Sequence, residues 1–269
     1  MTIITISRGS YSRGKEVAEQ VARQLGYELV AREVLIEASQ EFNVDEVKLV
    51  RAVSNAPSLF SRLSYAKERY IAFIRAALLD HLKKDNIVYH GMAGHFFVRD
   101  VAHALKVRII ADMEDRVQLV MKRDGISRKA AQRFIERIDR ERSKWSQQLY
   151  GIDSADPKLY DLVIHIKKIQ VECAVDIICH TARLERFQAS EESRRMLEDD
   201  ALAAHVKAVL VKDHPEAEVS AQDGVVHVTA KATEAEELHL AEKIKELVRQ
   251  VPGVKEVETH LHWFTPFGT

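Results

Sequence analysis

Short apolar runs alternate with longer amphipathic stretches over the first two thirds of the chain. The runs expected to form strands are Thr2–Ser7, Tyr27–Val30, Ile87–His90, Val107–Ala111 and Leu162–Ile166, and helices are expected between them, including stretches near Ser58–Lys84 and Ser127–Tyr150. Strands separated by helical segments indicate an α/β fold with a parallel sheet flanked by helices. The ligands of such a sheet bind beyond the carboxyl ends of its strands.

The pattern changes toward the C-terminus. A charged, helix-prone stretch, Arg183–Asp200, is followed by a helical pattern over Ala201–Lys212. Two strand patterns, Ala217–Ala221 and Val225–Ala230, then flank the turn Gln222-Asp223-Gly224. A second helix opens on the capping box Thr233/Glu236 and runs to Arg249, and a final strand alternates from Val257 to Trp263. This order, α-β-β-α-β, predicts a small α+β domain after the parallel sheet.

Charge is divided unevenly between these two parts. The whole chain has a net charge of −1 over 269 residues, but the part from Ala189 onward holds 9 Lys/Arg against 16 Asp/Glu, and the rest holds 31 against 25. The first part is therefore suited to small anions such as phosphates. It is not basic enough for charge alone to indicate nucleic acid, and we expect no nucleic-acid partner.

Residues 7–16, Ser-Arg-Gly-Ser-Tyr-Ser-Arg-Gly-Lys-Glu, stand between the first strand and an amphipathic helix. A buried strand, a glycine-bounded loop and a helix N-terminus together make a phosphate cradle, in which a lysine reaches the outer phosphates. Gly9 and Gly14-Lys15 have the spacing of such a loop, although Glu16 stands where a Ser or Thr would usually hold Mg²⁺. The alternative is a plain βα unit whose glycines only make a turn.

The stretch 115–150 is rich in arginine. On a helix that begins at the N-cap Ser127, the side chains of Arg133, Arg137, Arg140 and Lys144 share one face. A row of guanidinium groups is what a closing lid needs to hold phosphates during phosphoryl transfer. The alternative is a solvated helix with ion pairs such as Glu136–Arg140.

Other residues give weaker signals. Cys173 and Cys179 are expected as buried thiols of a cytoplasmic protein, since the sequence shows no signal-peptide pattern and no membrane-spanning run. His260 and His262 alternate on one strand face beside Glu256 and Glu258, but an exposed strand face is favoured because no third ligand is specified. No metal-ligating residue is therefore assigned.

The first part resembles the cytidylate kinase-like branch of the P-loop nucleoside monophosphate kinases. The resemblance is carried by Ile4-Thr5-Ile6-Ser7-Arg8 into Gly14-Lys15-Glu16, Leu25-Gly26-Tyr27 into Arg32-Glu33, Asp124-Gly125-Ile126-Ser127, Asp139-Arg140-Glu141-Arg142, Tyr150-Gly151, and Asp156-Pro157 with Tyr160-Asp161-Leu162-Val163. The later part is similar to a BON domain, a module of the α-β-β-α-β type linked to ligand, lipid or partner binding, through Asp223-Gly224-Val225-Val226 and Val251-Pro252-Gly253-Val254. The expected domains are residues 1–185 and 198–265, with a helical linker over 186–197.

The kinase resemblance implies Mg²⁺-dependent transfer of the γ-phosphoryl group of ATP to a pyrimidine nucleoside monophosphate. By motif, the donor phosphates would be held by Gly9, Ser12, Arg13, Gly14, Lys15 and Glu16, with Arg116 and Arg123 as further donor-side residues. The catalytic set would be Lys15 with the lid arginines Arg137, Arg140 and Arg142. The BON-like part would bind a small ligand or a protein partner.

The sequence departs from the family pattern at several positions. Tyr11 and Arg13 stand where relatives carry glycines, Ala31 replaces an aspartate, and Met92 replaces an arginine after the central strand. The loss of an acidic group and a guanidinium near the acceptor motivates an alternative: a catalytically impaired nucleotide-binding sensor that signals through the BON-like domain.

Overall fold

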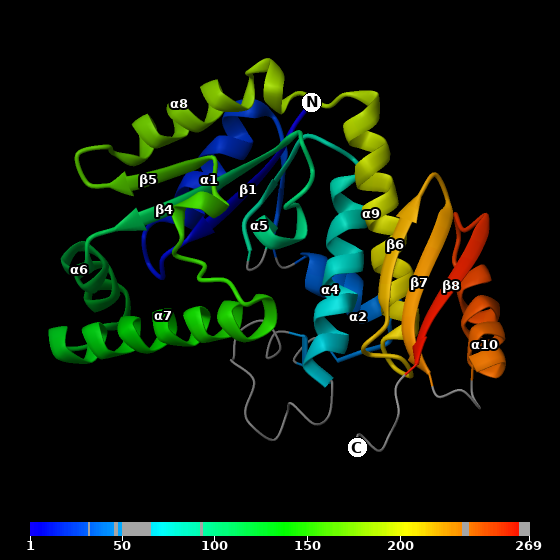
Figure 1. Cartoon of the computed structure of the whole chain (residues 1–269). Helices are drawn as coiled ribbons and strands as arrows, with labels where there is room; N and C mark the ends of the chain where they lie inside the picture. Colours follow the sequence, from blue (N-terminus) through cyan, green and yellow to red (C-terminus); the bar gives the residue numbers. More distant parts are fainter. Residues whose placement is uncertain (32, 46–47, 50–65, 92–93, 233–236, 264–269) are drawn as a thin grey trace.

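The large sheet has five parallel strands in the order β2-β3-β1-β4-β5 (Figure 1). The computed structural model describes residues 1–31, 33–45, 48–49, 66–91, 94–232 and 237–263. The strands are β1 (Ile3–Arg8), β2 (Glu28–Val30), β3 (Ile87–Tyr89), β4 (Ala104–Ala111) and β5 (Leu162–Ile166). The expected parallel sheet is therefore confirmed, with each expected strand within a few residues of its observed bounds.

Helices cover both faces of this sheet. The helices of this part of the chain are α1 (Gly14–Leu25), α2 (Glu33–Glu41), α4 (Ala66–Leu82), α5 (Gly94–Phe97), α6 (Met113–Asp124), α7 (Arg128–Tyr150) and α8 (Val171–Ala182), with short 3₁₀ turns at η2 (Pro157–Leu159) and η3 (Glu185–Phe187). α1 and α8 pack on one face, against Ile4 and Ile6 of β1. α4 packs on the other face, in the same core as Ile3. Because both faces are covered, the strands are apolar almost throughout.

Local signals in the sequence set several of these helix ends. Ser127 caps α7, where its side chain accepts a hydrogen bond from the Ala130 N–H at 3.4 Å. Gly26 ends α1 with φ 68°, a left-handed conformation that glycine adopts at little cost. The helix expected near Ser58–Lys84 is α4, and the expected start of that helix lies outside the described residues, as does the Thr233/Glu236 capping box.

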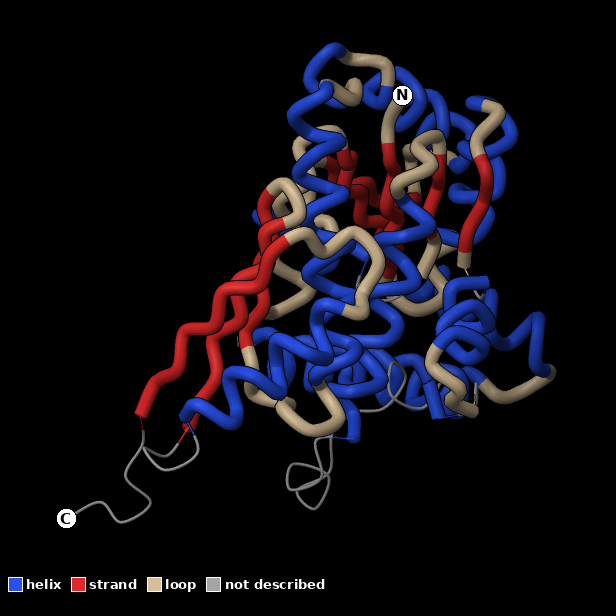
Figure 2. Tube along the Cα trace, turned by 90° about the vertical axis from the view of Figure 1, so that its right-hand side faces the viewer, coloured by secondary structure: helices blue, strands red, loops and turns tan. Residues whose placement is uncertain are grey.

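The small domain has the expected α-β-β-α-β order. Its elements are α9 (Glu191–Leu210), β6 (Glu218–Gln222), β7 (Val225–Ala232), α10 (Glu237–Arg249) and β8 (Glu256–Trp263). β6 and β7 are antiparallel across a tight turn in which Asp223 has φ 51° and Gly224 has φ 87°, and β8 adds to β7 in parallel. Figure 2 shows this sheet projecting from the side of the molecule.

Helix α9 belongs to both cores. Leu197 and Ala204 are buried against α4 in the core of the large sheet, whereas Val206 and Leu210 are buried under the small sheet. The helix begins on a reciprocal cap between Ser190 and Ser193. The boundary expected at residue 198 therefore falls inside one continuous helix.

The cysteine prediction is correct for one residue and wrong for the other. Cys179 is buried on α8, but Cys173 is exposed. Six residues on a helix place the two side chains about 240° apart, so only one can face the core. Among the described residues, no helix has the length and apolar character needed to cross a membrane.

Candidate functional site

The glycine loop leaves the carboxyl end of β1 and enters α1, as the sequence predicts. The Ser12 hydroxyl lies 2.9 Å from both the Gly9 and the Ile109 carbonyl oxygens, which ties the loop to β4. At Gly14 an added Cβ would lie 2.8 Å from the Cβ of Arg8. Only glycine therefore lets the start of α1 approach the end of β1 so closely.

Tyr11 and Arg13, where the family resemblance leads us to expect glycines, both have left-handed backbone angles, with φ 59° and 64°. The loop thus keeps a glycine-like path despite carrying side chains. The Tyr11 ring packs on Phe134 of α7 at 5.8 Å between centroids and lies under the Arg123 guanidinium at 4.6 Å. Arg13 makes two hydrogen bonds to Glu16, at 2.8 and 2.6 Å.

Lys15 follows in the first turn of α1. Its side chain is 75 % exposed and its Nζ lies 3.6 Å from Glu19, so the ammonium is free to reach a ligand at the helix N-terminus.

Helices α6 and α7 form a hairpin with a small core of its own, in which Val117 and Val120 pack against Ala131 and Ile135. Polar contacts connect this hairpin to the loop. Arg116 of α6 donates to the Ser10 carbonyl and hydroxyl oxygens, each at 2.7 Å, and pairs with Asp139 of α7. Asp139 accepts hydrogen bonds from the Ser10 N–H at 3.2 Å and from the Ser10 hydroxyl at 2.6 Å. A carboxylate of α7 thus accepts a hydrogen bond from a loop N–H.

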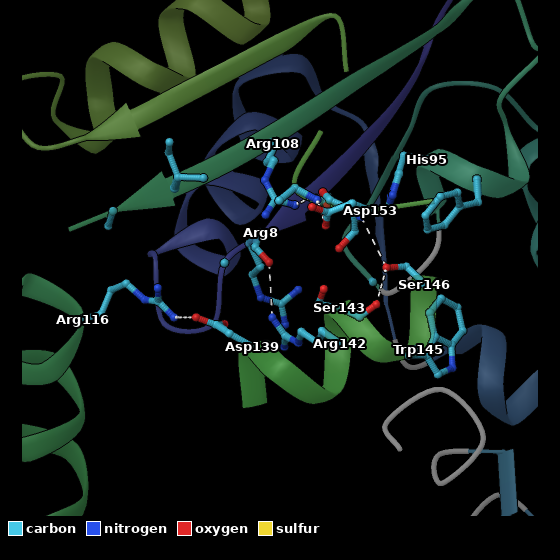
Figure 3. Close-up of a pocket in the computed structure, with 18 residues that line it drawn as sticks. Arg8, His95, Arg108, Arg116, Asp139, Arg142, Ser143, Trp145, Ser146 and Asp153 are labelled. Atoms are coloured by element: carbon cyan, nitrogen blue, oxygen red, sulfur yellow. Dashed lines mark hydrogen bonds and ion pairs between the residues drawn. The ribbon is translucent and has the colours of Figure 1, made fainter. Parts of the chain in front are cut away.

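A cationic cavity of about 340 Å³ opens beside the loop, between the strand ends and α7 (Figure 3). Arg8, Arg108 and Arg142 line it, and Arg142 donates to the Arg8 carbonyl oxygen at 3.3 Å. Among the described residues, none of these three guanidinium groups forms an ion pair with a carboxylate. The pKa of Arg8 is lowered to about 10, mainly by burial and secondly by the charge of Arg142. Burial also lowers the pKa of Arg142. Clustered, partly desolvated guanidinium groups favour a bound anion.

His95, Asp153 and Ser154 line another part of the cavity, and Tyr160 contacts His95 and Ser154. The Tyr160 hydroxyl lies 3.2 Å from Nε2 of His95 and donates to the Ser154 carbonyl oxygen at 2.8 Å, and the Arg108 guanidinium donates to that same oxygen at 2.6 Å. Burial, followed by the charge of Arg108, lowers the pKa of His95 to about 3. The pKa of nearby His90 is also lowered to about 3, mainly by burial and secondly by the charge of Arg8. Both imidazoles are therefore neutral at physiological pH.

A second cavity, of about 690 Å³, lies on the other side of the loop. Tyr11, Arg13 and Glu16 line it from the loop and α1, Leu119 lines it from α6, and Lys167 lines it from beyond β5. The loop thus separates two cavities, a smaller one lined by half-buried arginines and a larger one.

The residues expected at the site lie in three places. Gly9, Arg116 and Arg142 line the cationic cavity, and Arg13 and Glu16 line the second one. Arg137 and Arg140 are exposed on α7 and line neither cavity, and Arg137 lies over the Phe134 ring at 5.6 Å. Arg123 is held by Asp124 at 2.5 Å and by Tyr11. Ala31 follows β2, and its N–H donates to the Glu33 carboxylate at 2.7 Å. Met92 lies outside the described residues.

Sequence reasoning missed several residues of the cationic cavity. Arg8 and Asp139 stand in the family motifs but are given no role in binding, and Arg108 stands only within the expected strand Val107–Ala111. A signal existed for Arg108, because a charged residue inside a buried parallel strand needs a reason to be there. The helix spacing also predicts that Asp139, Arg142 and Ser146 share a face, different from that of Arg137 and Arg140.

Known proteins resemble the first part of this chain. The chain is 26% identical over 181 residues to the cytidylate kinase of Ignicoccus hospitalis, an alignment that covers 66% of this chain and 97% of that protein. It is 28% identical over 185 residues to the cytidylate kinase of Staphylothermus marinus, an alignment that covers 66% of this chain and 94% of that protein. An uncharacterized protein from Eubacterium ventriosum shares the fold with a TM-score of 0.52 at 20% identity, and the match covers 68% of this chain and 98% of that one.

The match extends over the whole first part. The model of the cytidylate kinase-like family fits residues 3–168, from β1 through the glycine loop and the α6–α7 hairpin to the end of β5. This chain belongs to the cytidylate kinase-like family.

Proposed function

We propose that the chain is a nucleoside monophosphate kinase, which transfers the γ-phosphoryl group of ATP to a pyrimidine nucleoside monophosphate. The observation that carries this proposal is the placement of Arg8, Arg108 and Arg142 around a cavity next to the glycine loop. Phosphoryl transfer needs little covalent chemistry from the protein, and its rate depends on positioning and on neutralising charge. An arginine-lined cavity beside a phosphate-binding loop supplies both.

The donor would bind at the loop. Its phosphates would meet the N-terminus of α1 and Lys15, and its base would enter the second cavity, past Tyr11 and Leu119. The Glu16 carboxylate and the Ser10 hydroxyl offer oxygen atoms, the hard donors that Mg²⁺ prefers, so the residues present fit this ion. When bound with ATP, Mg²⁺ neutralises charge on the β- and γ-phosphates.

The acceptor would bind in the cationic cavity. Its phosphate would lie among Arg8, Arg108 and Arg142, and its sugar and base would contact the neutral side chain of His95. A volume of about 340 Å³ is within the usual range for a small-molecule site. Because His95 is neutral, it can exchange hydrogen bonds with a base without adding charge.

The α6–α7 hairpin would serve as the lid. Arg142 faces the acceptor already, whereas Arg137 and Arg140 would reach the phosphates only after the hairpin moves. For the small domain we propose a BON-like role in binding a ligand or a partner, supported by its α-β-β-α-β order. Its connection to the kinase part through α9 would let binding at one part affect the other.

The test is ADP formation from Mg·ATP across CMP, dCMP, UMP, AMP and GMP. We expect turnover with a pyrimidine monophosphate. Arg142→Met should lower kcat/KM by about 10²–10³-fold, the usual loss when one charge-stabilising donor is removed. Lys129→Met is the matched control, because Lys129 is exposed in the first turn of the same helix and lines neither cavity.

Binding measurements separate the kinase from the alternative sensor. Lys15→Ala should abolish ATP binding by calorimetry, and unaltered affinity would refute the assignment of the loop. ATP binding without turnover on any monophosphate, with a changed protease sensitivity of the small domain, would instead support a nucleotide sensor.

A further inference from the structure

The small sheet carries a group of side chains that the kinase function does not use. His227 on β7 and Glu258 and His260 on β8 lie on the same face of the sheet, and their ligand atoms all lie within 4.8 Å of one another. Their side chains are 37 %, 47 % and 57 % exposed, so an ion could reach them from solvent.

The register of the sheet brings these residues together. In the parallel pair β7–β8, His227 lies directly beside Glu258, and His260 follows two residues further along β8. The inner face of β7, with Val226 and Val228, is buried in the small core. Because side chains alternate along a strand, His227 must point away from that core. The third ligand that the β8 sequence alone does not specify comes from the neighbouring strand.

Two of the distances within the group suit a shared ion. Nδ1 of His227 lies 3.0 Å from Oε2 of Glu258, and Nε2 of His260 lies 3.8 Å from the same oxygen. Ligands about 2.0–2.2 Å from a tetrahedral Zn²⁺ are about 3.3 Å apart, so these atoms bracket the required spacing. The two imidazole rings are nearly parallel, at 19° and 6.0 Å between centroids.

We propose that His227, Glu258 and His260 form a binding site for a divalent first-row transition metal such as Zn²⁺. Two imidazoles and one carboxylate are a donor set that such ions prefer, and three protein ligands leave a fourth position open to water or to a donor from another molecule. The charge of the region supports a cation, because residues from Ala189 onward carry 16 Asp/Glu against 9 Lys/Arg. Lys231 lies at the other end of β7 from His227, and its ammonium is paired with Glu216 at 3.2 Å.

His262 offers a matched control within the same strand. It is exposed on β8, two residues beyond His260, opposite Lys231 in the register and outside the group of three. Cys173 is an exposed thiol that could bind metal by itself, so the measurements use the full chain with Cys173→Ser.

The experiment is calorimetric titration of the chelator-treated full chain with Zn²⁺ at pH 7.5, followed by Co²⁺ titration monitored by visible absorption. We expect about one equivalent to bind, with affinity at least tenfold weaker in His227→Asn, Glu258→Gln and His260→Asn, and unchanged in His262→Asn. The Co²⁺ d–d bands should disappear in His227→Asn and persist in His262→Asn.

Three results would overturn the site: no binding, unchanged affinity in His227→Asn and His260→Asn, or an equal loss in His262→Asn, which would indicate diffuse binding to a histidine-rich surface. The site lies on the small sheet, so any of these results leaves the kinase proposal untouched. Circular dichroism of each variant shows whether the sheet still folds.

Discussion

Tyr11 and Arg13 hold backbone angles that residues other than glycine rarely adopt. A left-handed conformation costs a residue with a side chain roughly 1–2 kcal/mol, so the loop stores strain at both positions. The side chains partly offset this cost. Tyr11 packs on the lid hairpin and Arg13 binds Glu16, and neither lines the cationic cavity. The loop therefore takes left-handed angles at both positions although each carries a side chain.

Strain at Arg13 can be measured by comparing two substitutions. Arg13→Gly and Arg13→Ala both remove the ion pair with Glu16, which is exposed and contributes little. Only glycine relieves the left-handed angle. We expect Arg13→Gly to be more stable than Arg13→Ala by about 1 kcal/mol in urea unfolding. Equal stabilities would mean that the angle at residue 13 carries no strain.

His95 predicts a dependence of stability on pH. Its pKa is lowered to about 3 in the folded chain, against about 6.5 when unfolded. Between these values the unfolded chain binds the additional proton, so stability rises with pH and is lost as the pH falls from about 6.5 toward 3. The loss attributable to one such histidine is about 1.4 kcal/mol per pH unit.

The variant His95→Gln keeps a polar group near Tyr160 and cannot titrate in this range. Its stability should fall less steeply between pH 6 and pH 4 than that of the parent chain, as measured by urea unfolding at each pH. His180→Gln is the control, because His180 is exposed on α8 and should leave the slope unchanged. Parallel curves for the parent and His95→Gln would contradict the buried, neutral state of His95.

At the scale of elements, the strands and helix ends could be predicted because their signals are local. Ser127 caps α7, and Asp223-Gly224 makes the turn between β6 and β7. The family membership also confirms the expected phosphotransferase class.

The cationic cavity could not be predicted in the same way. Arg8, Arg108 and Arg142 come from β1, β4 and α7, and their convergence depends on strand order and on how the hairpin lies over the sheet.

The contact between Asp139 and Ser10 predicts a role for the lid in nucleotide affinity. The Asp139 carboxylate accepts the Ser10 N–H and pairs with Arg116, where donor phosphates would bind. Asp139→Ala removes this competing negative charge, and we expect the Kd for ATP to fall about tenfold in calorimetry. Glu136→Ala is the control, because Glu136 is exposed on the same helix and contacts Gln132. Weaker binding would mean instead that Asp139 holds the loop in its binding conformation.

At the scale of the whole molecule, α9 joins the two parts more closely than a linker would. Its residues Leu197, Ala201, Ala204 and Ala208 recur at helical spacing and are buried in the core of the large sheet. The charged residues that precede Leu197 led to the prediction of a helical linker over residues 186–197. Charge between apolar positions is, however, what an amphipathic helix with one exposed side requires.

This shared helix predicts that a substitution in the expected linker destabilises the kinase part. Leu197 is 2 % exposed whereas its neighbour Met196 is 43 % exposed, so the pair is a matched test. Leu197→Ala should lower the free energy of unfolding by about 2–5 kcal/mol, the usual cost of emptying a buried leucine site, and Met196→Ala should change it by less than about 0.5 kcal/mol. The measurement is urea unfolding followed by the fluorescence of Trp145, which is buried in the same core. If residues 186–197 were only a linker, both variants would unfold with the parent chain, and the two parts would melt independently. A shift of the Trp145 transition in Leu197→Ala alone would show that the kinase part needs α9 for its stability.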